Sequence, residues 1–196
     1  MRKVLMKIVA VAALTIGVQG GGDIAPVAPM PADNSGFYAG GGLAAVSTYG
    51  HKLNWFDETI GQDRTGALVG IIGYQFNPYI AVEGRAGFGV ITGDFSENYE
   101  FSLFLKPMYP VTDALTVYAL LGYGYVNVDG YHGHPDLTST GSFQWGLGAA
   151  YKLDERWSLF ADYTWLLHNK DADNALPDGS RDLSHEMFTV GVLYRF

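Results

Sequence analysis

Charged side chains occupy the middle of several segments whose other residues alternate between apolar and small. Glu83 and Arg85 stand two apart in one segment, Lys106 lies in the next, and Asp162 lies in a later one. Residues two apart on a strand point to the same face, so these acids and bases can meet on one side of a sheet. Groups of opposite charge arranged in this way form either ion pairs or a polar path for ions. The full candidate network is Glu83, Arg85, Glu100, Lys106, Gln144, Asp162 and Arg195.

Histidines offer a second chemistry. His132 and His134 lie two apart in a polar segment, and His51, His168 and His185 belong to segments near the same predicted edge. Two such imidazoles can share a transition metal, but no third ligand follows at a fixed spacing. We therefore expect surface histidines without a metal. The absence of cysteine excludes a thiol nucleophile, a disulfide framework and a cysteine zinc site.

The segment from His185 to Phe196 indicates which elements carry these side chains. One face holds Phe188, Val190, Val192, Tyr194 and Phe196, and the other holds Met187, Thr189, Gly191, Leu193 and Arg195. Similar alternation recurs through the chain, with small or charged residues opposite the apolar face. This pattern predicts an inside-out barrel that has lipid outside and polar groups inside.

Eight alternating segments follow one another from Phe37 onward. We expect strands at 37–49, 64–76, 79–91, 99–109, 115–128, 142–152, 157–167 and 185–196. Tight turns alternate with longer polar connections, and in outer-membrane barrels short turns face the periplasm. The predicted fold is all-β: an eight-stranded antiparallel up-and-down transmembrane β-barrel with short periplasmic turns and longer extracellular loops.

Two features of these strands affect how the interior is filled. The facing of the second strand stays open, because Leu68, Ile72, Tyr74 and Phe76 compete with Ala67, Val69 and Ile71 for the outer side. Many of the 26 glycines fall inside strands. In a small, strongly curved barrel they make room for large neighbours.

The interior of an eight-stranded barrel is just wide enough for side chains to fill it. If the connection 92–98 turns near its middle, antiparallel pairing brings Glu83 close to Lys106, and Asp162 can meet Arg85 across the lumen. The predicted lumen also holds the rings of Phe104, Tyr118 and Phe160. We expect a structural plug of salt bridges, with a narrow small-solute pore as the alternative.

The amino terminus predicts export. Residues 1–20 combine a basic start, an apolar stretch from Ile8 to Val18 and a small exit, which is the pattern of a signal peptide. Residues 21–36 form a Pro/Gly-rich periplasmic linker, and 37–196 form the barrel.

Composition limits the kinds of partner that the protein can bind. The net charge is −8 and the pI is about 4.9, which argues against binding nucleic acid. Most acidic residues fall in predicted loops. We interpret them as a solvated rim and not as a cation site, since no segment has the spacing of a calcium loop. No cofactor is expected.

Several segments resemble the eight-stranded outer-membrane β-barrel family of Gram-negative bacteria, the porin-family or OmpA-barrel-like surface proteins. These segments are Gly36–Leu43, Gly73–Glu83, Tyr109–Tyr125 and Thr189–Phe196. The resemblance covers nearly all of 37–196 and implies residence in the cell outer membrane. It also implies that the terminal aromatic residues Tyr194 and Phe196 form a signal for the outer-membrane assembly machinery.

The resemblance leaves the activity open. Its functions include envelope integrity and adhesion, so we expect a monomeric, non-enzymatic protein in contact with outer-membrane lipids, lipopolysaccharide and a possible host or environmental surface partner. Outer-membrane lipid A deacylases are also eight-stranded, but their His-x-Ser pair is missing after both His168 and His185. A soluble lipocalin-type barrel would place large apolar side chains inside and charged ones outside, which is the reverse of the pattern in the last strand.

Overall fold

The computed structural model describes residues 35–50, 53, 55–56, 62–91, 96–130, 138–176, 179 and 181–196. The predicted signal peptide and nearly all of the predicted linker lie outside these residues. The strands are β1 (Gly36–Tyr49), β2 (Gln62–Asn77), β3 (Ile80–Ile91), β4 (Ser96–Pro110), β5 (Leu115–Gly130), β6 (Thr138–Lys152), β7 (Trp157–Asp171) and β8 (Asp182–Arg195).

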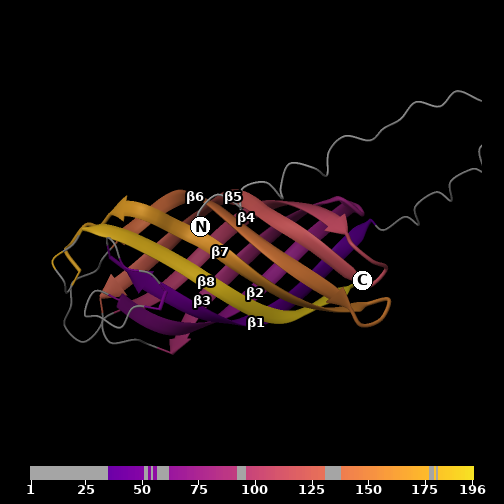
Figure 1. The fold of residues 1–196 in the computed structure, drawn as a ribbon, viewed down its shortest axis with the longest axis horizontal. Helices are drawn as coiled ribbons and strands as arrows, with labels where there is room; N and C mark the ends of the chain where they lie inside the picture. Colours follow the sequence, from indigo (N-terminus) through magenta and orange to yellow (C-terminus); the bar gives the residue numbers. More distant parts are fainter. Residues whose placement is uncertain are drawn as a thin grey trace, which may run out of the picture. The chain divides into compact units, whose positions relative to one another are not determined.

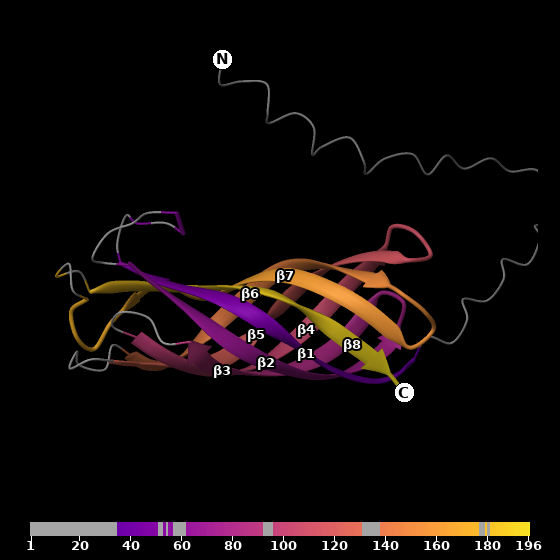
Figure 2. The ribbon, with the colours of Figure 1, turned by 90° about the horizontal axis from the view of Figure 1, so that it is seen from below.

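The eight strands form one closed sheet. Each strand pairs with its neighbour in the sequence, and β1 pairs with β8 to complete the barrel. All eight pairings are antiparallel. Figures 1 and 2 show the strands running obliquely around the barrel. The predicted eight-stranded up-and-down barrel is confirmed. No helix among the described residues is long and apolar enough to cross a membrane.

Short turns connect the strands at the end of the barrel where β8 finishes (Figure 1). Asn77, Thr112 and Asp154 each accept hydrogen bonds from the backbone N–H groups two and three residues further on. This local bonding stabilises a reversal in few residues. At the last turn, the N–H groups of Trp157 and Arg156 hold the pKa of the Asp154 carboxyl below its usual value.

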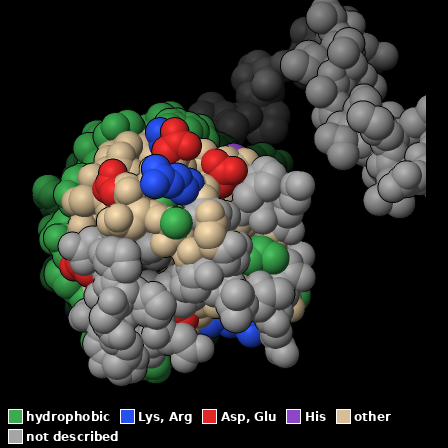
Figure 3. Space-filling view, turned by 90° about the vertical axis from the view of Figure 1, so that its left-hand side faces the viewer, with side chains coloured by type: hydrophobic (Ala, Val, Ile, Leu, Met, Phe, Trp, Pro, Cys, Tyr) green, Lys and Arg blue, Asp and Glu red, His purple; other side chains and the backbone are tan. Residues whose placement is uncertain are grey.

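The longer connections lie at the opposite end, which Figure 3 views directly with charged side chains at the rim and apolar ones along the flank. Here four predicted strand ends are wrong by three or four residues: β4 begins at Ser96, β6 at Thr138 and β8 at Asp182, and β7 continues to Asp171. The apolar alternation stops near these ends, but backbone pairing continues into polar sequence. Periodicity alone therefore shortens the strands.

The outer wall is apolar, as the alternation predicts. Exposed side chains include Phe101, Leu103 and Leu105 on β4 and Leu121 and Tyr123 on β5. On the second strand Leu68 and Ile72 are exposed, while Ala67, Val69 and Ile71 are buried; this settles the facing that the sequence leaves open.

Two glycines show how the narrow interior accommodates large rings. A Cβ added at Gly148 would lie 2.6 Å from the Tyr118 ring, and one added at Gly73 would overlap the Tyr38 ring. The predicted role of strand glycines in making room for neighbours is confirmed at these positions.

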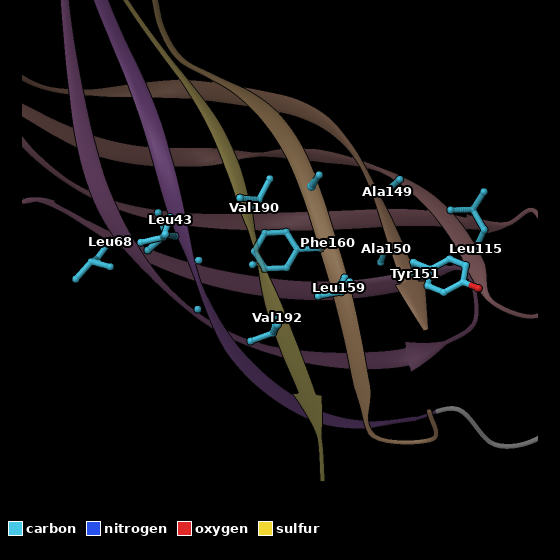
Figure 4. A pocket seen from close by; sticks show the side chains of 15 residues that line it. Leu43, Leu68, Leu115, Ala149, Ala150, Tyr151, Leu159, Phe160, Val190 and Val192 are labelled. Atoms are coloured by element: carbon cyan, nitrogen blue, oxygen red, sulfur yellow. The ribbon is translucent and has the colours of Figure 1, made fainter. Parts of the chain in front are cut away.

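A shallow apolar groove of about 950 Å³ crosses the outer wall from the start of β5 over β6, β7, β8 and β1 to β2 (Figure 4). Leu43, Leu159, Val190 and Val192 line it beside the small residues Gly41 and Ala161. Its lining suits packing against lipid chains.

The seam between β6 and β7 is less complete than its neighbours. Its ladder ends at the pair Trp145 and Trp165, although both strands continue beyond it. The two indole rings stack with centroids 3.9 Å apart, and the Ser142 hydroxyl donates to the Leu166 carbonyl at 2.5 Å. Beyond Trp165, β7 shifts register against β8.

Candidate functional site in the lumen

Four charged residues form a connected layer across the lumen. The Arg85 guanidinium donates through Nε to Glu83 Oε1 at 2.7 Å and through both Nη atoms to Asp162 at 3.0 and 2.7 Å. Lys106 Nζ donates to Glu83 Oε2 at 2.7 Å. All four side chains are at most 4% exposed. Because buried charges are tolerated only when they are paired and hydrogen-bonded, the four residues depend on one another.

Two tyrosines complete this layer, and sequence reasoning did not assign them a part in it. The Tyr38 hydroxyl donates to Glu83 at 2.7 Å, and the Tyr118 hydroxyl donates to Asp162 at 2.8 Å. Lys106 Nζ also lies 4.1 Å from the centroid of the Tyr118 ring. Every carboxylate oxygen of Glu83 and Asp162 therefore has a donor. A glycine on the adjacent strand could have indicated that each ring lies in the lumen, because Tyr38 pairs with Gly73 and Tyr118 pairs with Gly148.

Aromatic rings fill the remaining space around these charges. The guanidinium carbon of Arg85 lies 5.7 Å from the Phe104 ring and 5.9 Å from the Phe160 ring. Both rings are nearly completely buried. The layer is therefore built of matched charges enclosed by apolar surface, where ion pairing is stronger than in water.

The other predicted network residues lie outside the ion pairs. Gln144 accepts a hydrogen bond from the Ser102 hydroxyl at 2.6 Å, in the next layer toward the long loops. Glu100 is also in the lumen and buried, but neither of its carboxyl oxygens has a partner in the described part of the chain.

The structure does not bring Arg195 into the ion-pair layer. Its guanidinium donates to the Gln75 side chain and lines an open cavity of about 570 Å³ at the end with the short turns. Arg195 faces inward as its alternation predicts, but it lies too near the mouth of the barrel to reach Glu83.

Apolar residues fill the lumen toward the long loops. They include Val46, Val126, Leu166, Leu183 and Met187, each at most 2% exposed, and Leu176 joins them from the connection between β7 and β8. This part of the lumen is packed like an ordinary protein core.

Within the same region, the expectation of a surface histidine is wrong for His185. Its ring is 1% exposed, and Nδ1 lies 2.8 Å from the Thr48 hydroxyl. The reason is parity, because odd-numbered residues of β8 face inward. His168 is exposed, while His51, His132 and His134 lie outside the described residues. Among the residues that the structure describes, no group of acids and histidines is arranged to hold a metal.

Another buried carboxylate lies on the outer side of the barrel, and sequence analysis did not predict it. Glu186 accepts hydrogen bonds from the hydroxyls of Tyr49, at 2.5 Å, and Tyr163. Trp55, from the connection after β1, packs on the Tyr163 ring at 5.6 Å. Two phenols and one indole thus shield the charge from lipid at the end of the barrel that carries the long loops.

The predicted assembly signal lies at the opposite end. The Tyr194 ring contacts both Trp157 and Phe196, and the Phe196 N–H donates to the Phe37 carbonyl at 3.1 Å. Phe196 is 79% exposed, so its ring remains available on the outer surface.

A closed antiparallel barrel with an apolar outer wall and charges paired inside has the architecture of a transmembrane β-barrel. The family model for the outer membrane protein beta-barrel domain matches residues 15–196, so the chain belongs to this family. No curated protein sequence matches the chain.

Solved outer-membrane barrels share the fold at low sequence identity. Neisserial surface protein A has 13% identity and a TM-score of 0.60, with 83% of this chain and 98% of that chain covered. Ail of Yersinia pestis, solved with the heparin analogue sucrose octasulfate, has 16% identity and a TM-score of 0.56, covering 83% and 99%. AlkL in lipid bilayers has 16% identity and a TM-score of 0.55, covering 90% and 97%. At these identities the likeness concerns the fold alone.

Proposed function

We propose that this protein is an integral barrel of the bacterial outer membrane whose lumen is closed by side chains and whose role is structural or surface-interacting. It acts as a monomer in contact with outer-membrane lipids and lipopolysaccharide, after insertion by the assembly machinery that reads its terminal aromatic residues. Its surface partner belongs to a host or to the environment.

The ion-pair layer carries this proposal. A conducting pore needs charges that face water and leave a path beside them. Here the four charged side chains of the layer form ion pairs with one another, and the rings of Phe104 and Phe160 enclose them. These four are Glu83, Arg85, Lys106 and Asp162. The dry cluster around Leu166 and Met187 adds a second obstruction. A narrow pore therefore has less support than a closed lumen.

Catalysis has little support from the arrangement of side chains. Thr48 and His185 form a hydroxyl and imidazole pair at 2.8 Å, which is the geometry of an activated nucleophile. Both residues are at most 1% exposed. A substrate has no access to this pair, so its role is to satisfy two buried polar groups.

The charge of the loops limits the kind of surface partner. Between the strands at the end with the long loops, the sequence places Asp57, Glu58, Asp94, Asp136, Asp173 and Asp178 against only Lys52 and Arg181. An excess of acid repels polyanions such as the sulfated sugar bound by Ail. We expect binding to neutral or cationic surfaces and none to heparin.

Recordings in planar lipid bilayers test the closed lumen. The purified, folded protein should give no steady conductance at neutral pH, with a general porin as the positive control. Stable, ion-selective openings whose selectivity changes in Lys106→Gln would replace the proposal with a narrow channel.

A further inference from the structure

Glu100 is the one luminal carboxyl in the described part of the chain that has no partner for either oxygen. It is 5% exposed and lies on β4, between the ion-pair layer and the dry cluster. A Cβ added at Gly87 would lie 2.7 Å from Glu100 Cγ, so the glycine on β3 makes room for this side chain. The position is therefore built to hold a carboxyl group, although no donor among the described residues forms a hydrogen bond with it.

The space beside Glu100 is lined by Val46, Ala67 and Met187 together with the ring of His185. It has no room for a water molecule. Water therefore cannot supply the missing donors, and a metal ion with its ligands does not fit. An ionised carboxylate without donors or water is far more costly to bury than a neutral carboxylic acid.

The balance of charges in this part of the lumen also favours a neutral Glu100. Three acids, Glu83, Asp162 and Glu100, face two bases, Arg85 and Lys106. Both bases direct their donors at Glu83 and Asp162. One acid is left without a counter-charge, and it is Glu100.

We propose that Glu100 is a proton-binding site of the folded barrel: the bound proton supplies the third positive charge and keeps the lumen neutral. The inference stands on the geometry of the lumen and does not require that the lumen be non-conducting. Loss of the proton would place an unpaired charge against the dry cluster and loosen its packing.

The titratable groups around Glu100 define the competing explanation. Arg85 and Asp162 act on it from the side of the ion-pair layer: Arg85 favours a negative charge there, and Asp162 opposes it. Tyr99 neighbours it on β4, and His185 faces it from β8. Only His185 could accept the proton and form an ion pair with Glu100, but its Nδ1 is engaged with Thr48 and its surroundings are apolar.

The proposal fixes the sign of a pH dependence. The unfolded chain releases the Glu100 proton above about pH 4.3, the ordinary value for glutamic acid, while the folded barrel keeps it. The folded state then binds more protons than the unfolded state, so stability falls as pH rises. The loss is about tenfold in the folding equilibrium constant per pH unit, until the folded barrel also releases the proton.

The test is urea unfolding of the full chain in lipid vesicles between pH 5 and pH 7, followed by the gel mobility of unheated samples. Glu100→Gln keeps the shape and removes the titration, so it should weaken the dependence by about one proton, or about tenfold per pH unit. Glu155→Gln, at an exposed turn residue, should retain the wild-type slope. His185→Gln should not flatten the slope. A histidine that stays neutral in the fold but is protonated below about pH 6.5 in the unfolded chain adds stability as pH rises, so its removal steepens the fall.

Equal slopes for wild type and Glu100→Gln would overturn the proposal, and so would a slope flattened equally by His185→Gln. If Glu100→Gln fails to fold, infrared spectra of wild-type protein labelled with ¹³C-glutamate decide the matter at pH 6. A carboxylic-acid carbonyl band that is protected from exchange supports the proposal, and its absence overturns it.

Discussion

Leu105 and Lys106 are neighbours on β4 and face opposite environments. Leu105 is on the outer wall and 49% exposed, whereas Lys106 is in the lumen and 4% exposed. In a water-soluble barrel the two exposures would be exchanged. Here the apolar side chain meets lipid, and the charged side chain is enclosed by protein.

The two faces consequently obey different rules. An outer residue needs only to be apolar, because lipid chains adapt to any apolar shape. An inner residue needs particular partners, because neither water nor lipid satisfies a buried charge. On the outside, a substitution should therefore be tolerated whenever the new side chain is apolar. On the inside, it should be tolerated only when the contacts of the original side chain are kept.

The largest effect is expected from Arg85→Ala. This change leaves Asp162 and one oxygen of Glu83 without their cation, and breaking a buried pair costs about 3–5 kcal/mol of folding free energy. The urea midpoint of vesicle-embedded protein should fall accordingly. A midpoint equal to the wild type would mean that the inner face needs no specific partners.

Leu121→Arg tests the outer face. Leu121 lies on β5 opposite Leu105 and is 43% exposed, so a guanidinium there would enter hydrocarbon. The expected cost is about 2–4 kcal/mol, seen as less folded protein in the outer membrane. Leu121→Met is the matched control and should insert normally. Normal insertion of both variants would contradict the outward facing of this strand.

Tyr118→Phe gives a smaller change inside the same layer. It removes the hydroxyl that donates to Asp162 at 2.8 Å and keeps the ring that covers Lys106. The loss of one hydrogen bond to a buried carboxylate is worth about 1–3 kcal/mol. Tyr123→Phe on the same strand, at a lipid-exposed ring, should change the urea midpoint much less. Equal effects of the two would argue against a special role for the inner hydroxyl.

Arg195→Ala should have the smallest effect. Its guanidinium lies in the open cavity at the mouth of the barrel and contacts Gln75, where water can replace the lost contact. We expect a change below about 1 kcal/mol in unfolding free energy. An effect as large as that of Arg85→Ala would place Arg195 back in the central network.

Much of the fold could be predicted because the bilayer imposes a simple pattern. Alternation with period two identified all eight strands, and connection lengths identified the two ends. The sequence could not locate the strand ends next to the long loops, since Thr138 and Asp182 continue the ladders in polar sequence. Backbone pairing there does not depend on an apolar face.

The site could be predicted only in part, for a related reason. Parity places Glu83, Arg85, Lys106 and Asp162 inside, but contact also depends on the tilt of the strands around the barrel. Tilt determines which inward residues share a level, and a single sequence does not reveal it. Arg195 and Glu100 therefore face inward without joining the ion pairs, and Tyr38 unexpectedly donates a hydrogen bond to Glu83.

A double-mutant cycle between Arg85 and Asp162 tests most directly whether the inner face is held by specific partners. Arg85→Ala, Asp162→Ala and the double variant would be unfolded in urea in the same vesicles. The account predicts that the double variant loses less stability than the sum of the single variants, with a coupling of about 1–3 kcal/mol. Additivity within about 0.5 kcal/mol would contradict it, because the two charges would then contribute independently.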